Sequence, residues 1–342
     1  MNFTIEGYGG GSTVSQKLVL DTDLLRARVM SLEYKHLTAE EIRRIYIEET
    51  GSNPPAQIHV YHSEDFRNVN VNDSGFDGTI IHFYDEEKGI NQMYTIARGS
   101  EKREKDTWKP LDWAYNALGI FVGQSRSQYR DALEFDRKVT QIITEELKRK
   151  GQTIELKKIG LGHSQGGNHA EMIQLTEHRF SQVYVINDAP PSAYQLAYID
   201  KRFRYELAKK FTPNILSDYN LIYSIPPSEL KAFAEEYYKK QIDERSIHHL
   251  TAEEDLLYAV SGVRGFAELV HLIHQEMKCG RGQIIDKTNE AVEQYQKRNL
   301  LSNDLYKNSM NTAAQRYTNM INDMRGQHIT LYYDVIIREK KR

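Results

Sequence analysis

The sequence predicts an α/β fold, with a mostly parallel central sheet and helices on both of its faces. A nearly all-apolar run at residues 182–187 has the composition of a strand that is buried on both faces. Strand-like and helix-like segments alternate from about residue 91 to residue 187, which is the order that produces parallel strands joined by crossover helices. The chain has 342 residues, of which 39% are hydrophobic and 27% charged, and we expect a single domain spanning residues 1–342.

Residues 1–55 are expected to form a helical extension before the sheet. Their pattern is helical from about residue 14 to residue 49, and Thr38 and Glu41 have the spacing of a capping box. The prolines and glycine of residues 51–55 then break the chain. Three strands are predicted to follow, with the last two forming a hairpin, at residues 57–61, 76–84 and 91–97.

The central part of the chain reads as a helix, a strand and a second helix. The first helix is expected at about residues 128–150, with Gly151 just beyond its end. The strand is expected at residues 153–161, before a helical run at 168–175. The apolar strand at 182–187 comes next.

The remaining chain is predicted to be mostly helical. Residues 193–245 are expected to form a helical lid or cap over the site, because insertions at the C-terminal ends of strands cover the site in such folds. One helix in this segment is expected to start with Ser228 as its N-cap. A short strand is expected at 247–250, where the adjacent His248 and His249 would point to opposite faces and could not share a metal. Residues 264–325 are again helical, and 329–337 form a last strand.

The segment Gly162-His163-Ser164-Gln165-Gly166-Gly167 predicts a nucleophile elbow centred on Ser164. It contains Gly-x-Ser-x-Gly between a predicted strand and a predicted helix, which is the context that this turn requires. Side chains at residues 162 and 166 would clash with neighbouring backbone, and the helix N-terminus favours developing negative charge. The alternative is a glycine-rich turn without chemistry.

Several motifs in this order resemble the class 3 (fungal-type) lipases of the α/β-hydrolase superfamily. The elbow is similar to their GHSLGG motif, Arg98-Gly99-Ser100 to RG[ST], Asp112-Trp113 to D-W, and Ala189-Pro190 to G-A-P. The resemblance covers roughly residues 75–192 and implies an α/β-hydrolase fold and ester hydrolysis without a metal or cofactor. It also implies that Ser100 helps to form the oxyanion hole, together with the backbone N–H of Gln165. The chain departs from the family at Gln165, where leucine is usual, and at Asp188, where the family has glycine.

A serine nucleophile needs a base and an acid that orients the base. For the acid we favour Asp255, which follows a strand-like run and precedes apolar residues as the acid does in that family; Asp218 and Asp188 are the alternatives. For the base we favour His328, in a loop before the last predicted strand, because the family's histidine also lies late in a loop. His271 is the alternative, although it lies within an amphipathic helical pattern.

These residues predict a serine hydrolase that cleaves lipid-like or soluble acyl esters through a Ser-His-Asp triad. A mean hydropathy of −0.64 also allows a catalytically silent hydrolase-fold protein with a binding or regulatory role. The net charge of −3 argues against nucleic acid as a partner, but peripheral membrane contact stays open. The N-terminus lacks the basic and apolar regions of a signal peptide, so a cytoplasmic protein, or one exported by another route, is expected.

Overall fold

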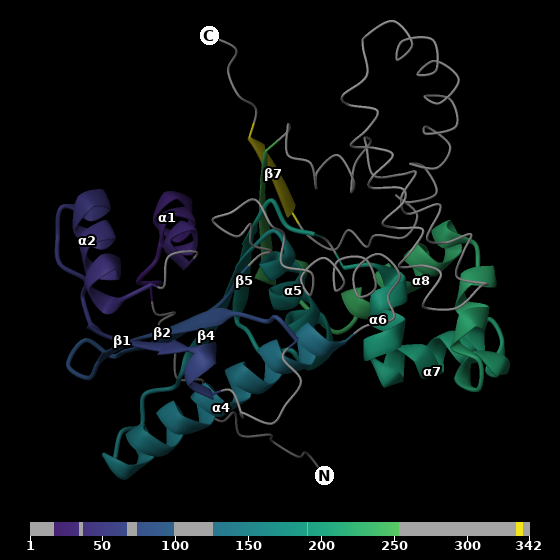
Figure 1. The fold of residues 1–342 in the computed structure, drawn as a ribbon, viewed down its shortest axis with the longest axis horizontal. Helices are drawn as coiled ribbons and strands as arrows, with labels where there is room; N and C mark the ends of the chain where they lie inside the picture. Colours follow the sequence, from purple (N-terminus) through teal and green to yellow (C-terminus); the bar gives the residue numbers. More distant parts are fainter. Residues whose placement is uncertain are drawn as a thin grey trace, which may run out of the picture.

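The computed structural model describes residues 17–33, 37–66, 74–98, 126–189, 191–252 and 333–337 (Figure 1). Its centre is a seven-stranded sheet in the order β1-β2-β3-β4-β5-β6-β7. The strands β1 to β3 pair antiparallel, and β3 to β7 pair parallel. Their bounds are β1 Gln57–His62, β2 Gly78–Asp85, β3 Ile90–Ala97, β4 Lys157–His163, β5 Gln182–Ile186, β6 Ile247–Ala252 and β7 Tyr333–Ile337. The predicted α/β class with a mostly parallel sheet is therefore confirmed.

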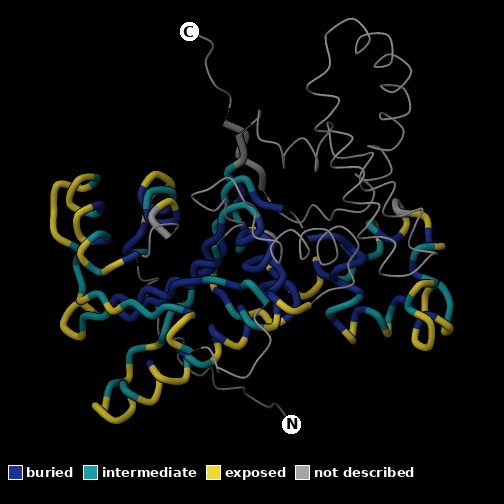
Figure 2. The backbone as a smooth tube through the Cα atoms, in the orientation of Figure 1, coloured by how far each residue is buried: buried dark blue, intermediate teal, exposed yellow. Residues whose placement is uncertain are grey.

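Helices cover both faces of this sheet. The helices α1 (Asp23–Glu33) and α2 (Ala39–Thr50) pack on one face, while α4 (Ser127–Arg149) and α5 (Gln165–Glu177) pack on the other (Figure 1). Each face has its own hydrophobic core, and the strands β2 to β4 between the two cores are largely buried, as is almost the whole of α5 (Figure 2). The ends of α2 and α4 extend beyond the sheet and are exposed.

Local sequence signals explain where several helices begin and end. Thr38 is the N-cap of α2 and accepts from the Glu41 N–H, while the Glu41 side chain accepts from the Thr38 N–H, so the predicted capping box is confirmed. The helix α4 ends at Arg149, and Gly151 adopts φ 72° just beyond it, a left-handed conformation that glycine tolerates without strain. The predicted helical extension thus consists of two short helices.

Two predicted boundaries were wrong. The strand expected at 153–161 begins only at Lys157, because its pairing with β3 starts with Gln92 opposite Lys157. The carbonyl of Ile154, three residues earlier, accepts instead from the side chain of Asn91 at 2.7 Å. Ser228 is not an N-cap, because α8 (Pro227–Lys239) already begins at Pro227. A proline suits the first helical position, where its missing N–H is not needed.

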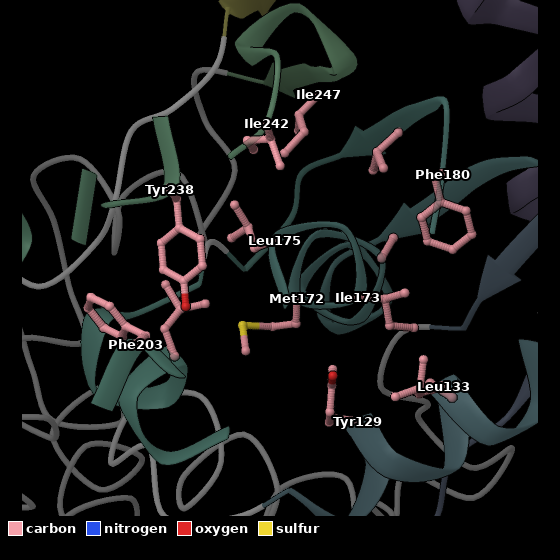
Figure 3. Close-up of a cluster of buried hydrophobic side chains, with 14 of the residues drawn as sticks. Tyr129, Leu133, Met172, Ile173, Leu175, Phe180, Phe203, Tyr238, Ile242 and Ile247 are labelled. Carbon is pink, nitrogen blue, oxygen red and sulfur yellow. The ribbon is translucent and has the colours of Figure 1, made fainter. Parts of the chain in front are cut away.

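The segment 193–245 is helical, as predicted. It contains α6 (Ala193–Ile199), α7 (Lys201–Lys210) and α8, with the short 3-10 turns η3 Pro213–Leu216, η4 Tyr219–Ser224 and η5 Glu244–Ser246. Phe203 and Tyr238 from this segment lie in the same apolar cluster as Met172 and Leu175 of α5 (Figure 3). These helices therefore extend the core on the α5 face of the sheet, and their role as a cover over the site stays a prediction.

Candidate active site

Ser164 lies at the junction of β4 and α5, at the C-terminal end of the parallel strands. Its backbone has φ 56° and ψ −127°, a conformation that residues with a side chain rarely adopt and that costs on the order of 1–3 kcal/mol. The residue is the N-cap of α5, yet within the described part of the chain its hydroxyl makes no capping hydrogen bond. A strained serine whose hydroxyl is not used to cap the helix is the arrangement that a nucleophile elbow presents.

Three glycines around Ser164 are required by close packing of the backbone. An ideal Cβ on Gly162 would lie 2.4 Å from the carbonyl oxygen of Gly166, and one on Gly166 would lie 1.9 Å from the carbonyl oxygen of Ala97. A Cβ on Gly167 would lie 2.5 Å from the Cβ of Asp188. Backbone atoms cannot move aside as side chains do, so the glycine spacing read from the sequence is explained by contacts among β3, β4, α5 and the segment after β5.

Backbone hydrogen bonds hold the elbow to the neighbouring strand. The Ser164 N–H donates to the Ile186 carbonyl at 3.2 Å, and the Ala189 N–H donates to the Ser164 carbonyl at 3.1 Å. Asn187, directly after β5, also has a positive φ of 43°, and its N–H donates to the Leu250 carbonyl at 3.0 Å. Two residues with positive φ thus lie at the same ends of adjacent strands; asparagine tolerates this conformation well, so the strain is at Ser164.

The side chain of Gln165, which stands where the GHSLGG motif has leucine, belongs to a buried polar network. Its amide donates to Gln128 Oε1, and Gln128 in turn donates to the Ser74 carbonyl at 2.9 Å. The His169 Nε2 atom lies 3.2 Å from the same Gln128 oxygen. Burial lowers the pKa of His169 to about 3, so this ring is neutral near pH 7. The network ties the first turn of α5 to the first turn of α4.

Asp188, one of the alternatives for the catalytic acid, lies in a buried cluster with Glu171 of α5 and His249 of β6. Its Oδ1 atom is 2.9 Å from His249 Nδ1, and one oxygen or nitrogen atom from each of the three residues lies within 4.8 Å of the others. These are the described residues whose donor atoms converge closely enough to hold a cation. His248, in contrast, stacks on the Tyr184 ring at 4.6 Å, so the two adjacent histidines make separate contacts, as predicted for opposite faces of a strand.

The structure accounts for two further residues of the predicted motifs. Asp218 is exposed and caps the turn η4, with its carboxylate accepting from the Asn220 N–H at 3.0 Å. Arg98, which begins the RG[ST]-like motif, pairs with the carboxylate of Asp77, and its N–H donates to the Asp77 carbonyl at 3.0 Å. This contact fixes the chain at the end of β3. The other predicted residues lie outside the described residues: Ser100, Asp112, Trp113, Asp255, His271 and His328.

Sequence reasoning did not identify Glu171 and His249 as parts of the site. Both looked like ordinary residues of a helix and a strand, and only the pairing of Val185 with His249 between β5 and β6 brings the imidazole to Asp188. One signal was available, since Asp188 replaces the glycine that the resemblance predicts. A charged residue at such a buried position needs partners.

Comparison with known proteins places the chain in a family. A family model described as "Domain of unknown function (DUF6792)" matches residues 24–274. The chain belongs to this family. The elbow, β3 to β6 and the cluster around Asp188 all lie within the matched region.

Two further similarities were found. The protein YvcB of Bacillus subtilis (strain 168) is 32% identical over 278 residues, which cover 74% of this chain and 41% of that protein. The chain thus spans about two fifths of the length of this relative. The crystal structure of a mutant of the esterase E40 aligns with 71% of this chain and 81% of that chain at 12% identity and a TM-score of 0.20, a value that does not establish a shared fold. None of the helices in the described part of the chain combines the length and the apolar composition of a membrane-spanning segment.

Proposed function

We propose that this chain is a serine hydrolase of the α/β-hydrolase type that cleaves carboxylic esters through an acyl-enzyme. The strained backbone of Ser164, enclosed by three glycines on which an added Cβ would lie 2.5 Å or less from a neighbouring atom, is the observation that carries the proposal. A glycine-rich turn without chemistry would have no need of a serine at the strained position, because glycine adopts a positive φ without cost. The strain is best explained by the need to present a hydroxyl at the end of the sheet.

The proposed chemistry follows the resemblance to class 3 lipases. The Ser164 hydroxyl attacks the ester carbonyl, His328 takes its proton and returns it to the leaving alcohol, and Asp255 orients the histidine. The backbone N–H of Gln165, together with Ser100, stabilises the oxyanion. The topology supports Asp255 over Asp218, because β6, the second parallel strand beyond β4, ends at Ala252, three residues before Asp255 in the sequence.

Soluble or amphiphilic acyl esters are the proposed substrates, rather than aggregated triglyceride. In residues 193–245, Tyr194, Phe203 and Tyr238 are buried, and the other aromatic side chains except Tyr205 are partly buried. Among the described residues of this segment, the large hydrophobic side chains that are exposed are Tyr205 and Leu216. A lid that binds to a lipid surface would expose a continuous apolar patch. Brief contact with a membrane surface remains compatible with this proposal, whereas nucleic acid is not a proposed partner.

A fluorophosphonate probe tests the nucleophile directly. We expect the wild-type protein to be labelled at Ser164, identified by peptide mass spectrometry, and the Ser164→Ala variant to remain unlabelled. Ser217→Ala is the matched control, because Ser217 is an exposed serine that hydrogen-bonds only within its own turn, and this variant should be labelled like the wild type. If the wild-type protein is neither labelled nor able to cleave short p-nitrophenyl esters, the chain is the catalytically silent binding protein instead.

A further inference from the structure

The buried residues Glu171, Asp188 and His249 bring two carboxyl groups and one imidazole together next to the elbow. They are 0%, 7% and 4% exposed, and they come from three separate segments: α5, the chain after β5, and β6. One carboxylate oxygen or ring nitrogen from each residue lies within 4.8 Å of those from the other two. Bulk water therefore does not screen the charges of this cluster.

Two acidic side chains at this separation need positive charge or a proton between them. Ionised carboxylates in the interior repel each other, and buried charges are stable only when they are paired or bind a metal. Asp188 pairs with His249, whose Nδ1 atom lies 2.9 Å from Asp188 Oδ1. This pair balances at most one carboxylate, because one imidazolium carries a single positive charge. Balancing the charge of the second carboxyl group as well requires either a bound proton or a divalent cation.

The types of side chain in the cluster favour the cation. A proton shared between two carboxyl groups has no need of an imidazole, whereas carboxylate oxygens and an imidazole nitrogen are common ligands of Zn²⁺ and other first-row transition metals. Mg²⁺ and Ca²⁺ are bound mainly by oxygen atoms, so the histidine argues against them. A divalent ion beside two carboxylates and a neutral imidazole gives a site without net charge, as a buried site requires.

The separations within the cluster suit a single ion. Carboxylate oxygens and imidazole nitrogens bind Zn²⁺ at about 2.1 Å, so two ligands of one ion lie between about 3 and 4.2 Å apart. The 2.9 Å between Asp188 Oδ1 and His249 Nδ1 already agrees with the shorter value. The 4.8 Å limit on the other separations exceeds the longer value by only about half an ångström.

We propose that Glu171, Asp188 and His249 bind one divalent transition-metal ion, with Zn²⁺ as the expected ion, which ties α5 to β6 beside the elbow. This site has a structural role, and no step of the proposed ester hydrolysis passes through the ion. It goes beyond the resemblance to class 3 lipases, because Asp188 stands where the G-A-P motif of that family has glycine.

Contacts of Asp188 connect the site to the elbow. Asp188 packs so closely against Gly167 that an ideal Cβ there would lie 2.5 Å from the Cβ of Asp188. The next residue, Ala189, donates its N–H to the Ser164 carbonyl at 3.1 Å. An ion that fixes Asp188 therefore also restrains the strained turn, through side-chain packing and through a backbone hydrogen bond.

The metal content of the purified full chain tests the site. After incubation with Zn²⁺ and removal of the excess, we expect about one zinc per chain by mass spectrometry of the elements. Glu171→Gln and Asp188→Asn, which remove a carboxylate with little change of shape, should retain less than a tenth of this amount. Glu177→Gln is the matched control and should bind zinc like the wild type, because Glu177 is an exposed carboxyl group of the same helix that pairs with Arg137.

Two further measurements follow the effect of the ion on the fold. Zn²⁺ at about a hundred times its dissociation constant should raise the melting temperature of chelator-treated wild type by about 5 °C, whereas Mg²⁺ should not. Hydrogen exchange of the peptide with residues 162–168 should slow when Zn²⁺ is added. If the two variants do not fold, X-ray absorption of the zinc-loaded wild type decides, and we expect oxygen ligands and a single imidazole.

Three results would overturn the proposal, and none depends on whether Ser164 is reactive. The wild type does not bind zinc, and its infrared spectrum at neutral pH contains the C=O band of a protonated carboxylic acid that Glu171→Gln lacks; a proton then occupies the site. Folded Glu171→Gln and Asp188→Asn bind zinc like the wild type, which places the ion elsewhere. Zinc binds, but the exchange of residues 162–168 is unchanged, so the ion does not restrain the elbow.

Discussion

The two ends of strand β4 each carry a buried polar cluster, but the clusters are built differently. At the N-terminal end, the Asp136 carboxylate accepts from Lys158 and Arg179, both at 2.6 Å, and from the Thr95 hydroxyl at 3.0 Å. Arg179 lies in the loop between α5 and β5. At the C-terminal end, the cluster of Asp188 contains two carboxyl groups and one imidazole, and it lies beside the strained Ser164.

This difference is the one expected between a structural cluster and the proposed functional site. The Asp136 carboxylate pairs with both Lys158 and Arg179, so the cluster can be explained by its contribution to the junction between α4 and β4. The elbow end combines a strained turn with an excess of acid groups, and neither of these stabilises the fold. Such features persist only where the surrounding structure enforces them, and they occur most often at functional sites.

The largest expected effect is on catalysis by the elbow. Ser164→Ala should reduce the hydrolysis of short p-nitrophenyl esters by ~10⁴-fold or more, because the acyl-enzyme can no longer form. The measurement is steady-state kinetics, with the melting temperature as the control for folding. If the folded Ser164→Ala protein keeps full activity, Ser164 is not the nucleophile. The two ends of β4 would then no longer differ in their proposed function.

Gly166→Ala should destabilise the fold by at least about 3 kcal/mol and abolish labelling of Ser164, because the new Cβ would collide with the Ala97 carbonyl. The control is Gly89→Ala, since Gly89 has φ 64° but no atom within 4 Å of an added Cβ. That variant should lose only about 1 kcal/mol of its free energy of unfolding, which is the cost of placing alanine in the left-handed backbone conformation. Urea unfolding measures both, and equal losses would contradict the backbone clash.

Asp136→Ala should lower the free energy of unfolding by about 3 kcal/mol, because it leaves Lys158 and Arg179 near the interior without their carboxylate. Urea unfolding measures this loss. The rate at which the folded protein is labelled at Ser164 should not change. Glu134→Ala on the same helix is the control, since its pair with Lys138 is at the surface and should contribute less than about 1 kcal/mol. A large change in labelling by Asp136→Ala would mean that the two ends are coupled.

The smallest expected effect is on the pH dependence of the free energy of unfolding, through Lys158 at the N-terminal end of β4. Burial lowers the pKa of Lys158 to about 8, against the opposing effect of Asp136. Between about pH 8 and 9.5 the unfolded chain therefore binds more protons at Lys158 than the folded chain does, so this group makes the free energy of unfolding rise with pH. We expect the free energy of unfolding of the wild type, relative to that of Lys158→Met, to rise by about 1 kcal/mol across this pH range. Urea unfolding at several pH values measures this difference. A difference that is flat or falls with pH would show that Lys158 stays charged.

Much of the fold could be predicted because its signals are local. The capping box of Thr38 and Glu41, the hairpin of β2 and β3, and the strand-turn-helix around Ser164 each involve residues close together in the sequence. The boundary errors at Lys157 and Ser228 arose where a neighbouring strand or a proline decided the first residue of an element. The glycines of the elbow were identified from local spacing, although two of their contacts, with Ala97 and with Asp188, are long-range.

By itself, the sequence determined the α/β class and the elbow at Ser164, because periodicity and glycine spacing act over a few residues. Only the tertiary structure decided which polar residues meet at the two ends of β4. Asp188 and His249 are 61 residues apart, and the pairing of β5 with β6 brings them together; Asp136 likewise meets Lys158 and Arg179 because α4 packs against the sheet. Asp255 and His328 stay predictions for the same reason, since a catalytic triad is assembled by contacts between distant segments rather than by local spacing.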